Sequence, residues 1–411
     1  MNTKRVESST NKSTVLAGVV LLSVALPGGY AIAQGGDGIP TPPGAVRMGP
    51  LSVYPSVTYE LQRNDNVLLQ DEGSGNVKSD TLQVLKPELR AEAVSGPHTF
   101  GAGLGFQAGR YNNLSSDDFN TNNVFLGADL NPDTRINLRL RAEHLDAIDP
   151  RGSTTDPLTP TPNRYRQTTL GGIFGFGAPK AKGRFELEVG GLAKRYYNNE
   201  ASGVQGNNRD DTLMGGTFFW RVAPKTSVLA QVKRTDIDFI DDATRLDSND
   251  MKYYLGVTWE ATAKTTGIFK LGTVRKDFND SARSDVSTPS WDAQIKWEPL
   301  SYSTWDFIVS RAYRETTVNV GDTVLASSNT AVWNHKWNSR VSTRAIGSYA
   351  IDEYKGLARK DKLPTLGLKA TYQMRRWLGI GADYTWTRRD SDVGGADYKK
   401  NVLMFFINAT L

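Results

Sequence analysis

The sequence lacks cysteine altogether and holds only three histidines among its 411 residues. Disulfide bonds and thiolate metal sites are therefore impossible, and an exported chain of this kind depends on its sheet and its packing for stability. His98 falls at a predicted turn, His144 near an outer strand end, and His335 between two tryptophans. Because no two of them share a predicted site, we expect no histidine-based metal centre or catalytic triad.

Familiar catalytic motifs are also missing. The chain has no G-x-S-x-G, no H-E-x-x-H, no phosphate-binding loop and no EF-hand loop. Its formal net charge is only +5, from 49 Lys and Arg against 44 Asp and Glu. That balance is too mild to favour nucleic-acid binding. We therefore expect neither an enzyme nor a cofactor, metal or nucleic-acid partner.

Long hydrophobic runs are confined to the first 35 residues, and the mean hydropathy is −0.44. A basic start is followed by the apolar run from Val15 to Leu26 and by Ala31-Ile32-Ala33, which is typical of a signal peptide cleaved after Ala33. An uncleaved anchor is the alternative, but the run is short for a membrane span. The domains expected are a signal peptide (1–33), an irregular Gly/Pro-rich periplasmic segment (34–50) and a barrel (51–411).

From Leu51 onward, apolar and polar residues alternate with a period of two. In residues 133–146 one face carries Arg135, Asn137, Arg139, Arg141 and Glu143, and the other carries Ile136, Leu138, Leu140 and Ala142. A helix would scatter both sets around its circumference. Strands with one apolar face and one polar face are what a transmembrane β-barrel requires, with lipid outside and water inside.

Eighteen such segments follow one another. The predicted strands are 51–63, 78–94, 97–111, 120–130, 133–146, 164–177, 182–196, 209–222, 225–238, 249–261, 264–277, 287–298, 302–315, 325–338, 339–352, 362–374, 375–389 and 396–411. Short connections alternate with long polar ones, as periplasmic turns and external loops do in outer-membrane barrels. The sequence thus predicts an all-β, closed antiparallel barrel of about 18 strands, with 16 possible. A soluble sandwich is the alternative, but it gives no reason for turn lengths to alternate.

Aromatic residues gather near the predicted strand ends, where amphipathic rings favour the lipid headgroups. The tryptophans concerned are Trp220, Trp259, Trp297, Trp305, Trp333, Trp337 and Trp377. Packing across strands is the alternative for each. The last strand resembles the C-terminal signal read by the barrel-assembly machinery, although it ends in Leu411 rather than the usual Phe. We therefore expect a bacterial outer-membrane location and the assembly machinery and lipid as partners.

The predicted interior carries both signs of charge. Its candidate pore-lining residues are Arg135, Arg139, Arg141, Glu143, Lys252, Glu260, Asp292, Lys296, Lys369 and Asp383. A strongly ion-selective pore would show a ring of one sign. The mixture favours hydrated, hydroxyl-rich solutes, although some of these groups could simply neutralise one another as ion pairs.

Three features of the predicted external ends invite a functional interpretation. The acidic pairs Asp117-Asp118 and Asp241-Asp242 are expected to be solvated, with weak Ca²⁺ or saccharide contact as the alternative. The pair Tyr196-Tyr197 could stack on a sugar ring, but is more often part of an interface girdle. Trimeric porins usually fold a long loop inward, and the proline-rich 147–163 connection is the candidate here.

The residues that open the barrel resemble a known family. Tyr59 to Val67, then Ser79-Asp80, then Leu85 to Leu89 are similar to the start of the EpsL-like outer-membrane barrels encoded in exopolysaccharide biosynthesis operons. The specific likeness spans about forty residues, and the strand pattern extends it over the mature chain. The resemblance implies secretion of an exopolysaccharide chain, together with a periplasmic polysaccharide-export protein. It implies no catalytic residue.

Two classes of function remain. The favoured one is a pore for exopolysaccharide export, and the alternative is a general diffusion porin for small hydrophilic solutes or a structural barrel. Glycosyltransferase genes beside this gene would favour export. An isolated gene induced by nutrient limitation would favour uptake.

Overall fold

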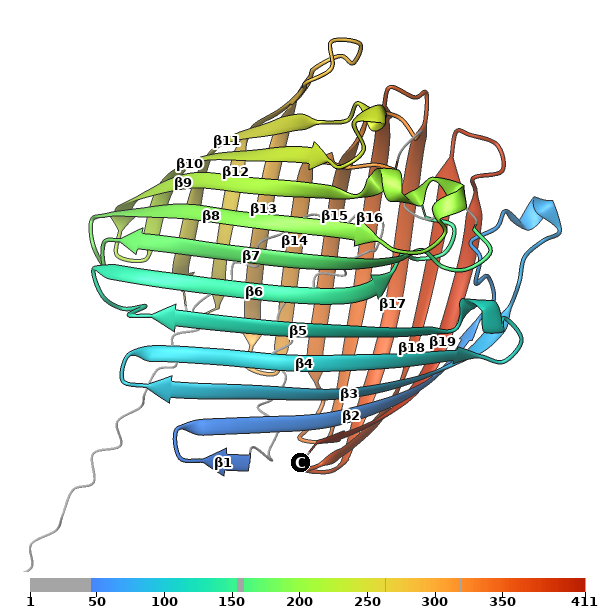
Figure 1. Ribbon diagram of the computed structural model, residues 1–411. Helices are drawn as coiled ribbons and strands as arrows, with labels where there is room; N and C mark the ends of the chain where they lie inside the picture. Colours follow the sequence, from blue (N-terminus) through green and yellow to red (C-terminus); the bar gives the residue numbers. More distant parts are fainter. Residues whose placement is uncertain (1–45, 154–158, 263, 318–319, 411) are drawn as a thin grey trace, which may run out of the picture.

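A computed structural model describes residues 46–153, 159–262, 264–317 and 320–410 of the chain. Its single antiparallel sheet closes on itself as a barrel of eighteen strands, β2 to β19, preceded by a short strand β1 (Figure 1). The predicted signal peptide lies outside the described residues. The strands are β1 Val46–Met48, β2 Leu51–Asn64, β3 Asp80–Ser95, β4 His98–Tyr111, β5 Phe119–Leu130, β6 Ile136–Ile148, β7 Arg164–Phe176, β8 Gly183–Tyr196, β9 Arg209–Ala223, β10 Thr226–Phe239, β11 Ser248–Thr262, β12 Thr265–Phe278, β13 Val286–Leu300, β14 Ser303–Arg314, β15 Thr323–Lys336, β16 Val341–Lys355, β17 Lys360–Arg375, β18 Leu378–Ser391 and β19 Tyr398–Thr410.

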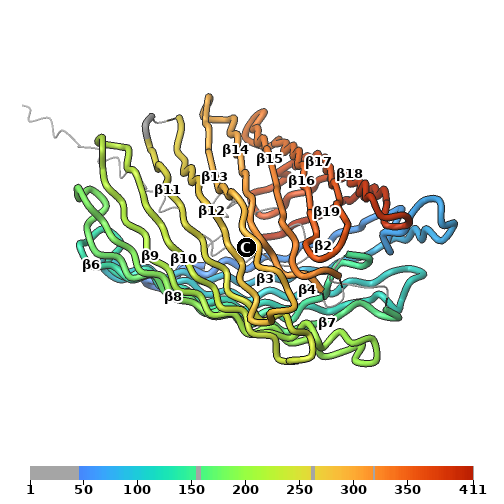
Figure 2. The backbone as a smooth tube through the Cα atoms, turned by 90° about the horizontal axis from the view of Figure 1, so that it is seen from above, coloured from blue at the N-terminus to red at the C-terminus, as the bar shows by residue number. Residues whose placement is uncertain are grey.

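Closure is made by the first and last long strands. β19 pairs with β2 in antiparallel register, with Phe405 opposite Leu61 and Ile407 opposite Tyr59. Every other strand pairs with its neighbours in the sequence, so no edge of the wall is left open. Viewed from above, strands β6 to β10 and β14 to β18 form opposite sides of the wall (Figure 2). The predicted fold class, an all-β barrel of eighteen strands, is confirmed.

The connections alternate in length around the barrel. Those at the end where both termini lie have two to six residues, whereas the 65–79, 149–163 and 197–208 connections at the other end are long. Five short 3-10 helices lie among the described residues, all in the long connections: Glu72–Ser74, Ser115–Asp117, Glu200–Ser202, Val204–Asn207 and Asp242–Thr244. In the described part of the chain, no helix is long and apolar enough to cross a membrane. By the usual topology of such barrels, we call the long-loop end the outer end and the other the inner end.

Two details differ from the sequence prediction. The 34–50 segment, expected to be irregular, contains β1, in which Val46 pairs with Val53 of β2 across a turn with Gly49 at a φ of 64°. Strand β6 begins at Ile136 rather than 133, so Arg135 lies in the preceding turn, where its guanidinium stacks 4.5 Å from the centre of the Phe176 ring. β1 gains a partner in β2, whereas residues 133–135 form a turn before β6 instead of extending the strand.

The apolar faces of the strands point outward. Leu255 is 71% exposed, and Ile136 and Leu140 are exposed as predicted. The alternate positions of β6, Arg139 and Arg141, lie on the opposite side and contact Asp129 of β5. The outer surface of the wall is therefore apolar and suited to lipid, and the inner surface is polar.

The outer ends of β14 and β15 pack against the lumen face of β12. Tyr313 and Leu325 form a buried cluster with Val274, and Lys276 reaches past them to Glu315. Lys276 Nζ lies 2.7 Å from Glu315 and 3.3 Å from Asp250, and its side chain is fully buried. This part of the wall is thus two layers thick, and it holds a buried cluster of one cation and two carboxylates.

Candidate functional site: the lumen and its inward segment

Three of the ten predicted lumen residues lie together on β6. Arg139 Nε and Arg141 Nη2 lie 3.4 Å and 2.9 Å from the carboxylate of Asp129. Glu143 follows on the same face and remains exposed. Two arginines therefore share one carboxylate, which holds both side chains against the wall.

The other predicted residues are spread around the barrel. Lys296 pairs with Glu298 at 2.8 Å, Asp292 with Lys270 at 3.4 Å, and Asp383 accepts a hydrogen bond from Thr385. These residues lie on β13, β12 and β18, so they form no common ring. Asp292 and Lys296 are neutralised locally, in line with the ion pairs weighed above, whereas the partner of Asp383 is uncharged.

Other candidates have no ion pair among the contacts of the described residues, and Lys369, Lys252 and Glu260 are three of them. Lys369 lies opposite Asp383 in register but places its ammonium 4.6 Å over the Phe406 ring. Lys252 of β11 lies opposite Lys233. Glu260, near the inner end of β11, is exposed. Arg135, as described above, lies outside the strand, so it does not belong to the lumen wall.

Glycines on the lumen face lie directly opposite large side chains. The ring of Phe125 covers Gly103, and the amide of Asn123 covers Gly105, each from the paired position of β5. A Cβ atom on either glycine would collide with that side chain. The same arrangement recurs at Gly109 with Phe119, Gly127 with Arg141, Gly175 with Asn137, Gly215 with Lys233 and Gly381 with Phe406. Large side chains therefore lie flat along the wall instead of projecting from it.

In the connection after β6, the described residues 149–153 turn inward, and Asp149 at their base is buried. Asp149 accepts a hydrogen bond from the Tyr196 hydroxyl at 2.8 Å and lies 3.7 Å from Lys194 Nζ. Lys194 is sandwiched by the rings of Tyr165 and Tyr196, with 3.9 Å and 4.7 Å to their centres. Burial raises the pKa of Asp149 to about 6 despite the nearby ammonium. Tyr196 is thus part of an internal anchor and not of the girdle predicted from the sequence.

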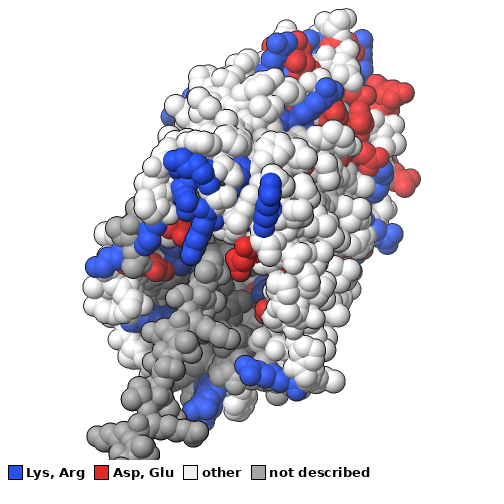
Figure 3. Space-filling model, turned by 90° about the vertical axis from the view of Figure 1, so that its left-hand side faces the viewer, with Lys and Arg blue, Asp and Glu red and all other residues white. Residues whose placement is uncertain are grey.

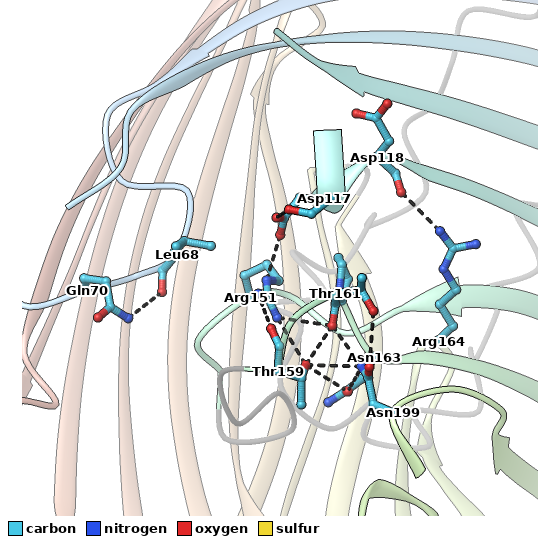
Figure 4. Close-up of polar contacts among 12 residues, drawn as sticks. Leu68, Gln70, Asp117, Asp118, Arg151, Thr159, Thr161, Asn163, Arg164 and Asn199 are labelled. Carbon is cyan, nitrogen blue, oxygen red and sulfur yellow. Dashed lines mark hydrogen bonds and ion pairs between the residues drawn. The ribbon is translucent and has the colours of Figure 1, made fainter. Parts of the chain in front are cut away.

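Arg151 joins the two described parts of this connection, 149–153 and 159–163 (Figure 4). Its Nε lies 2.7 Å from the buried carboxylate of Asp117, and its Nη2 donates to the carbonyl of Thr159 at 2.6 Å. Asn199 donates to the carbonyl of Thr161 from the neighbouring connection. Asp117 was expected to be solvated; it is buried because the segment folds over it.

The segment also reaches strands far away around the barrel. Arg389 of β18 donates to the carbonyl of Gly152 at 3.4 Å, although β19 and β2 to β5 separate β18 from β6. Gly152 has a φ of 64°, and a Cβ there would collide with the carbonyl of Leu68 in the 65–79 connection. The described residues 149–153 therefore cross part of the outer half of the lumen.

Removing the charge of Arg151 should loosen this segment. In Arg151→Gln, the buried carboxylate of Asp117 loses its cation. Removing one partner of a buried ion pair typically lowers the free energy of unfolding by about 3–5 kcal/mol. We expect faster proteolysis within 149–163 in the folded barrel and a larger, noisier single-channel conductance. Arg166→Gln is the matched control, because the exposed Arg166–Asp146 pair should contribute about 0–1 kcal/mol. Equal proteolysis in both variants would contradict the anchoring role.

The inner rim of the barrel is basic. Its eight short turns contain seven Lys or Arg and one acidic residue, Asp133: Arg135, Lys180, Lys182, Lys225, Lys264, Arg340 and Arg376 are the cations. In Figure 3, blue side chains are spread over this end with a few red ones between them, and most red ones gather at the upper right. At the outer end, many carboxylates are engaged by the loop backbone, such as Asp241 with Ala243 N and Asp247 with Phe239 N. The acidic pair Asp241-Asp242 is thus partly a loop cap.

A closed barrel of eighteen strands with an apolar outer face, a polar lumen and an inward segment defines an outer-membrane porin. The chain belongs to the family described as Putative beta-barrel porin 2, which matches residues 40–410. Porins are channels and not enzymes. The structure is similar to a BenF-like porin from Pseudomonas fluorescens (11% identity, TM-score 0.49, covering 87% of this chain and 99% of that one). It is also similar to OccK2 from Pseudomonas aeruginosa (10% identity, TM-score 0.48, covering 88% of this chain and 97% of that one). A third similar structure is a bacterial polysaccharide outer membrane secretin (11% identity, TM-score 0.37, covering 87% of this chain and 98% of that one). No curated protein matches the chain.

Several residues of the site could not be found from sequence. Lys194, Asp149 and Arg151 were not predicted, since their partners come from other strands and loops. The proline-rich 147–163 connection was the one local signal, and its described residues 149–153 turn toward β18. The buried Lys276 and Arg389 had no signal of their own, because both look like ordinary lumen positions.

Proposed function

We propose that this porin is the outer-membrane pore for export of an exopolysaccharide. The observation that carries the proposal is the lumen wall, on which glycines let large side chains lie flat and most charges are paired within the wall. Such a surface presents hydrogen-bonding groups without strongly binding any ion. A hydroxyl-rich chain can slide along it, because the described part of the wall carries no ring of single-sign charge that would hold it in place.

The residues that resemble the EpsL-like barrels support the proposal. Lys86 pairs with Glu60 at 2.8 Å on the lumen face of β3 and β2. Asn66 donates to the carbonyls of Gln70 and Lys399, and Asp80 accepts from Asn113 N and Leu114 N. The motif therefore shapes one sector of the lumen and fixes the two loops above it. Export would also need a periplasmic polysaccharide-export protein, for which the inner rim is the available docking end.

Deleting the gene tests the proposal. Secreted polymer should disappear while polymer accumulates in the periplasm or on the cell, and growth on small nutrients should be normal, because synthesis is intact and only the exit is lost. Polymer in the medium and in cell fractions would be quantified by sugar composition. Complementation with the wild-type gene is the control. Unchanged secretion in the deletion strain would reject the export role.

The inward segment supports a second candidate, a diffusion porin for small hydrophilic solutes. Residues 149–153 cross part of the lumen between β6 and β18, which would limit the size of a solute. A deletion strain that secretes polymer normally but takes up small sugars more slowly would favour this function. In that case, liposome swelling with sugars of increasing size would show a sharp cutoff in the purified protein.

A further inference from the structure

Seven arginines lie on the outward face of the wall near its outer end. We call them the arginine belt: Arg63, Arg110, Arg166, Arg195, Arg234, Arg275 and Arg388. Each lies within six residues of the outer end of its strand. The side chains of the last six are 42–62% exposed. The belt therefore faces the surroundings of the barrel and not its lumen.

The belt begins where the apolar outer surface ends. On β10, the exposed Val228 and Val232 share their face with Arg234, and on β12 the exposed Phe269 and Leu271 share theirs with Arg275. Alternate residues of a strand point to one side, so each arginine continues its apolar row toward the outer end. The arginines thus lie at the boundary between the hydrocarbon and the polar layer of the outer leaflet.

Three members of the belt repeat the same local arrangement. Arg234, Arg275 and Arg388 each donate through Nε to an aspartate two residues further along the strand, Asp236, Asp277 and Asp390, at 2.9, 2.5 and 2.5 Å. The carboxylate fixes one edge of the guanidinium. In the described structure, no carboxylate contacts Nη1 of these three arginines, so donors remain available for a ligand outside the barrel.

The inner boundary of the wall has a different chemistry. Trp220, Trp297, Trp337 and Trp377 are exposed there. At the inner ends of β14 and β15, the Trp305 ring stacks on Trp333, and the rings of Trp333, His335 and Trp337 contact one another at tilted or edge-on angles. The girdle predicted from the sequence is therefore confined to one end. Exposed tryptophans thus gather at the inner boundary and arginines at the outer one, where Tyr197 and Tyr253 are also exposed.

We propose that the arginine belt binds the phosphate groups of lipopolysaccharide, the phosphorylated glycolipid of the outer leaflet. The guanidinium fork matches phosphate oxygens in a bidentate manner, which an ammonium cannot do. Exposed pairs with aspartate contribute only about 0–1 kcal/mol to stability, so these pairs alone do not account for seven outward arginines at one boundary. The aspartates orient the arginines, and the lipid phosphates complete their hydrogen bonding.

Lipid retention by the purified barrel tests the proposal. A variant combining Arg234→Gln, Arg275→Gln and Arg388→Gln should retain about tenfold less lipopolysaccharide after detergent extraction, because three bidentate contacts are lost. Bound lipid would be measured by phosphate content and native mass spectrometry on the folded, heat-modifiable protein. The corresponding Lys variant should retain an intermediate amount, since it keeps the charge but loses the fork.

The matched control is a variant of lumen arginines, Arg139→Gln with Arg141→Gln, which should retain lipopolysaccharide like the wild type. Competition with phosphatidylglycerol micelles distinguishes the source of the phosphate, and we expect weak competition. Full retention by the triple Gln variant would overturn the proposal. Equal competition by phosphatidylglycerol would overturn its assignment to lipopolysaccharide.

Discussion

Leu255→Arg should prevent most of the protein from assembling as a barrel. Leu255 lies in the middle of β11, on the lipid face, and is 71% exposed. An arginine on the lipid face near the middle of the bilayer destabilises the folded barrel by about 2–4 kcal/mol. The measurement is the fraction of heat-modifiable protein in outer-membrane extracts, followed by urea unfolding of the refolded protein in lipid vesicles.

Thr258→Arg in the same strand is the control. Thr258 lies on the opposite, lumen face of β11, where an added charge remains in contact with water. The variant should therefore assemble at nearly the wild-type level. If both variants assembled equally well, Leu255 would not face lipid and the assignment of the outer surface would be wrong.

Lys276→Met should destabilise the folded barrel by about 3–5 kcal/mol, because removing one member of a buried ionic group leaves its partners uncompensated. Here the partners are two carboxylates, Asp250 and Glu315, which would lose the ammonium group that both of them contact. The same substitution would loosen the inward packing of β14 on β12. Urea unfolding of the refolded protein, followed by tryptophan fluorescence, measures the change.

Replacing the whole cluster separates charge from packing. Lys276→Met combined with Asp250→Leu and Glu315→Leu should recover most of the lost stability, because a buried ionic group exchanged for apolar residues of similar size is often neutral or stabilising. Should the triple variant be as unstable as Lys276→Met alone, the loss would come from the shape of the lysine side chain and not from its charge.

The wall of the barrel was predictable from the sequence because its information is local. Alternation of polar and apolar residues sets the faces, and turn residues such as Gly96-Pro97 and Pro224 set the ends, so the predicted strands agree with the observed ones to within about three residues. The exception is β1, where three residues pair with β2 in a way that the pattern does not reveal.

The contents of the lumen were less predictable, because they depend on contacts between segments far apart in the chain. Tyr196 and Tyr197 are adjacent, yet Tyr196 is buried on Asp149 while Tyr197 bonds to Asp146 at the surface. The folding of β14 onto β12 likewise brings Glu315 to Lys276 across the sheet. A period-two pattern predicts which face of a strand a residue occupies, but it does not predict which residues of other strands contact it there.

The glycines opposite large side chains make the calibre of this pore adjustable in small steps. In a barrel, the circumference changes only when strands are added or the stagger between them shifts, and either change alters every pairing in the wall. At Gly103 or Gly105, a single methyl group would instead turn the ring of Phe125 or the amide of Asn123 toward the axis. Related chains could therefore acquire wider or narrower passages by substitutions at such positions, while the eighteen-strand frame and its register stay as they are.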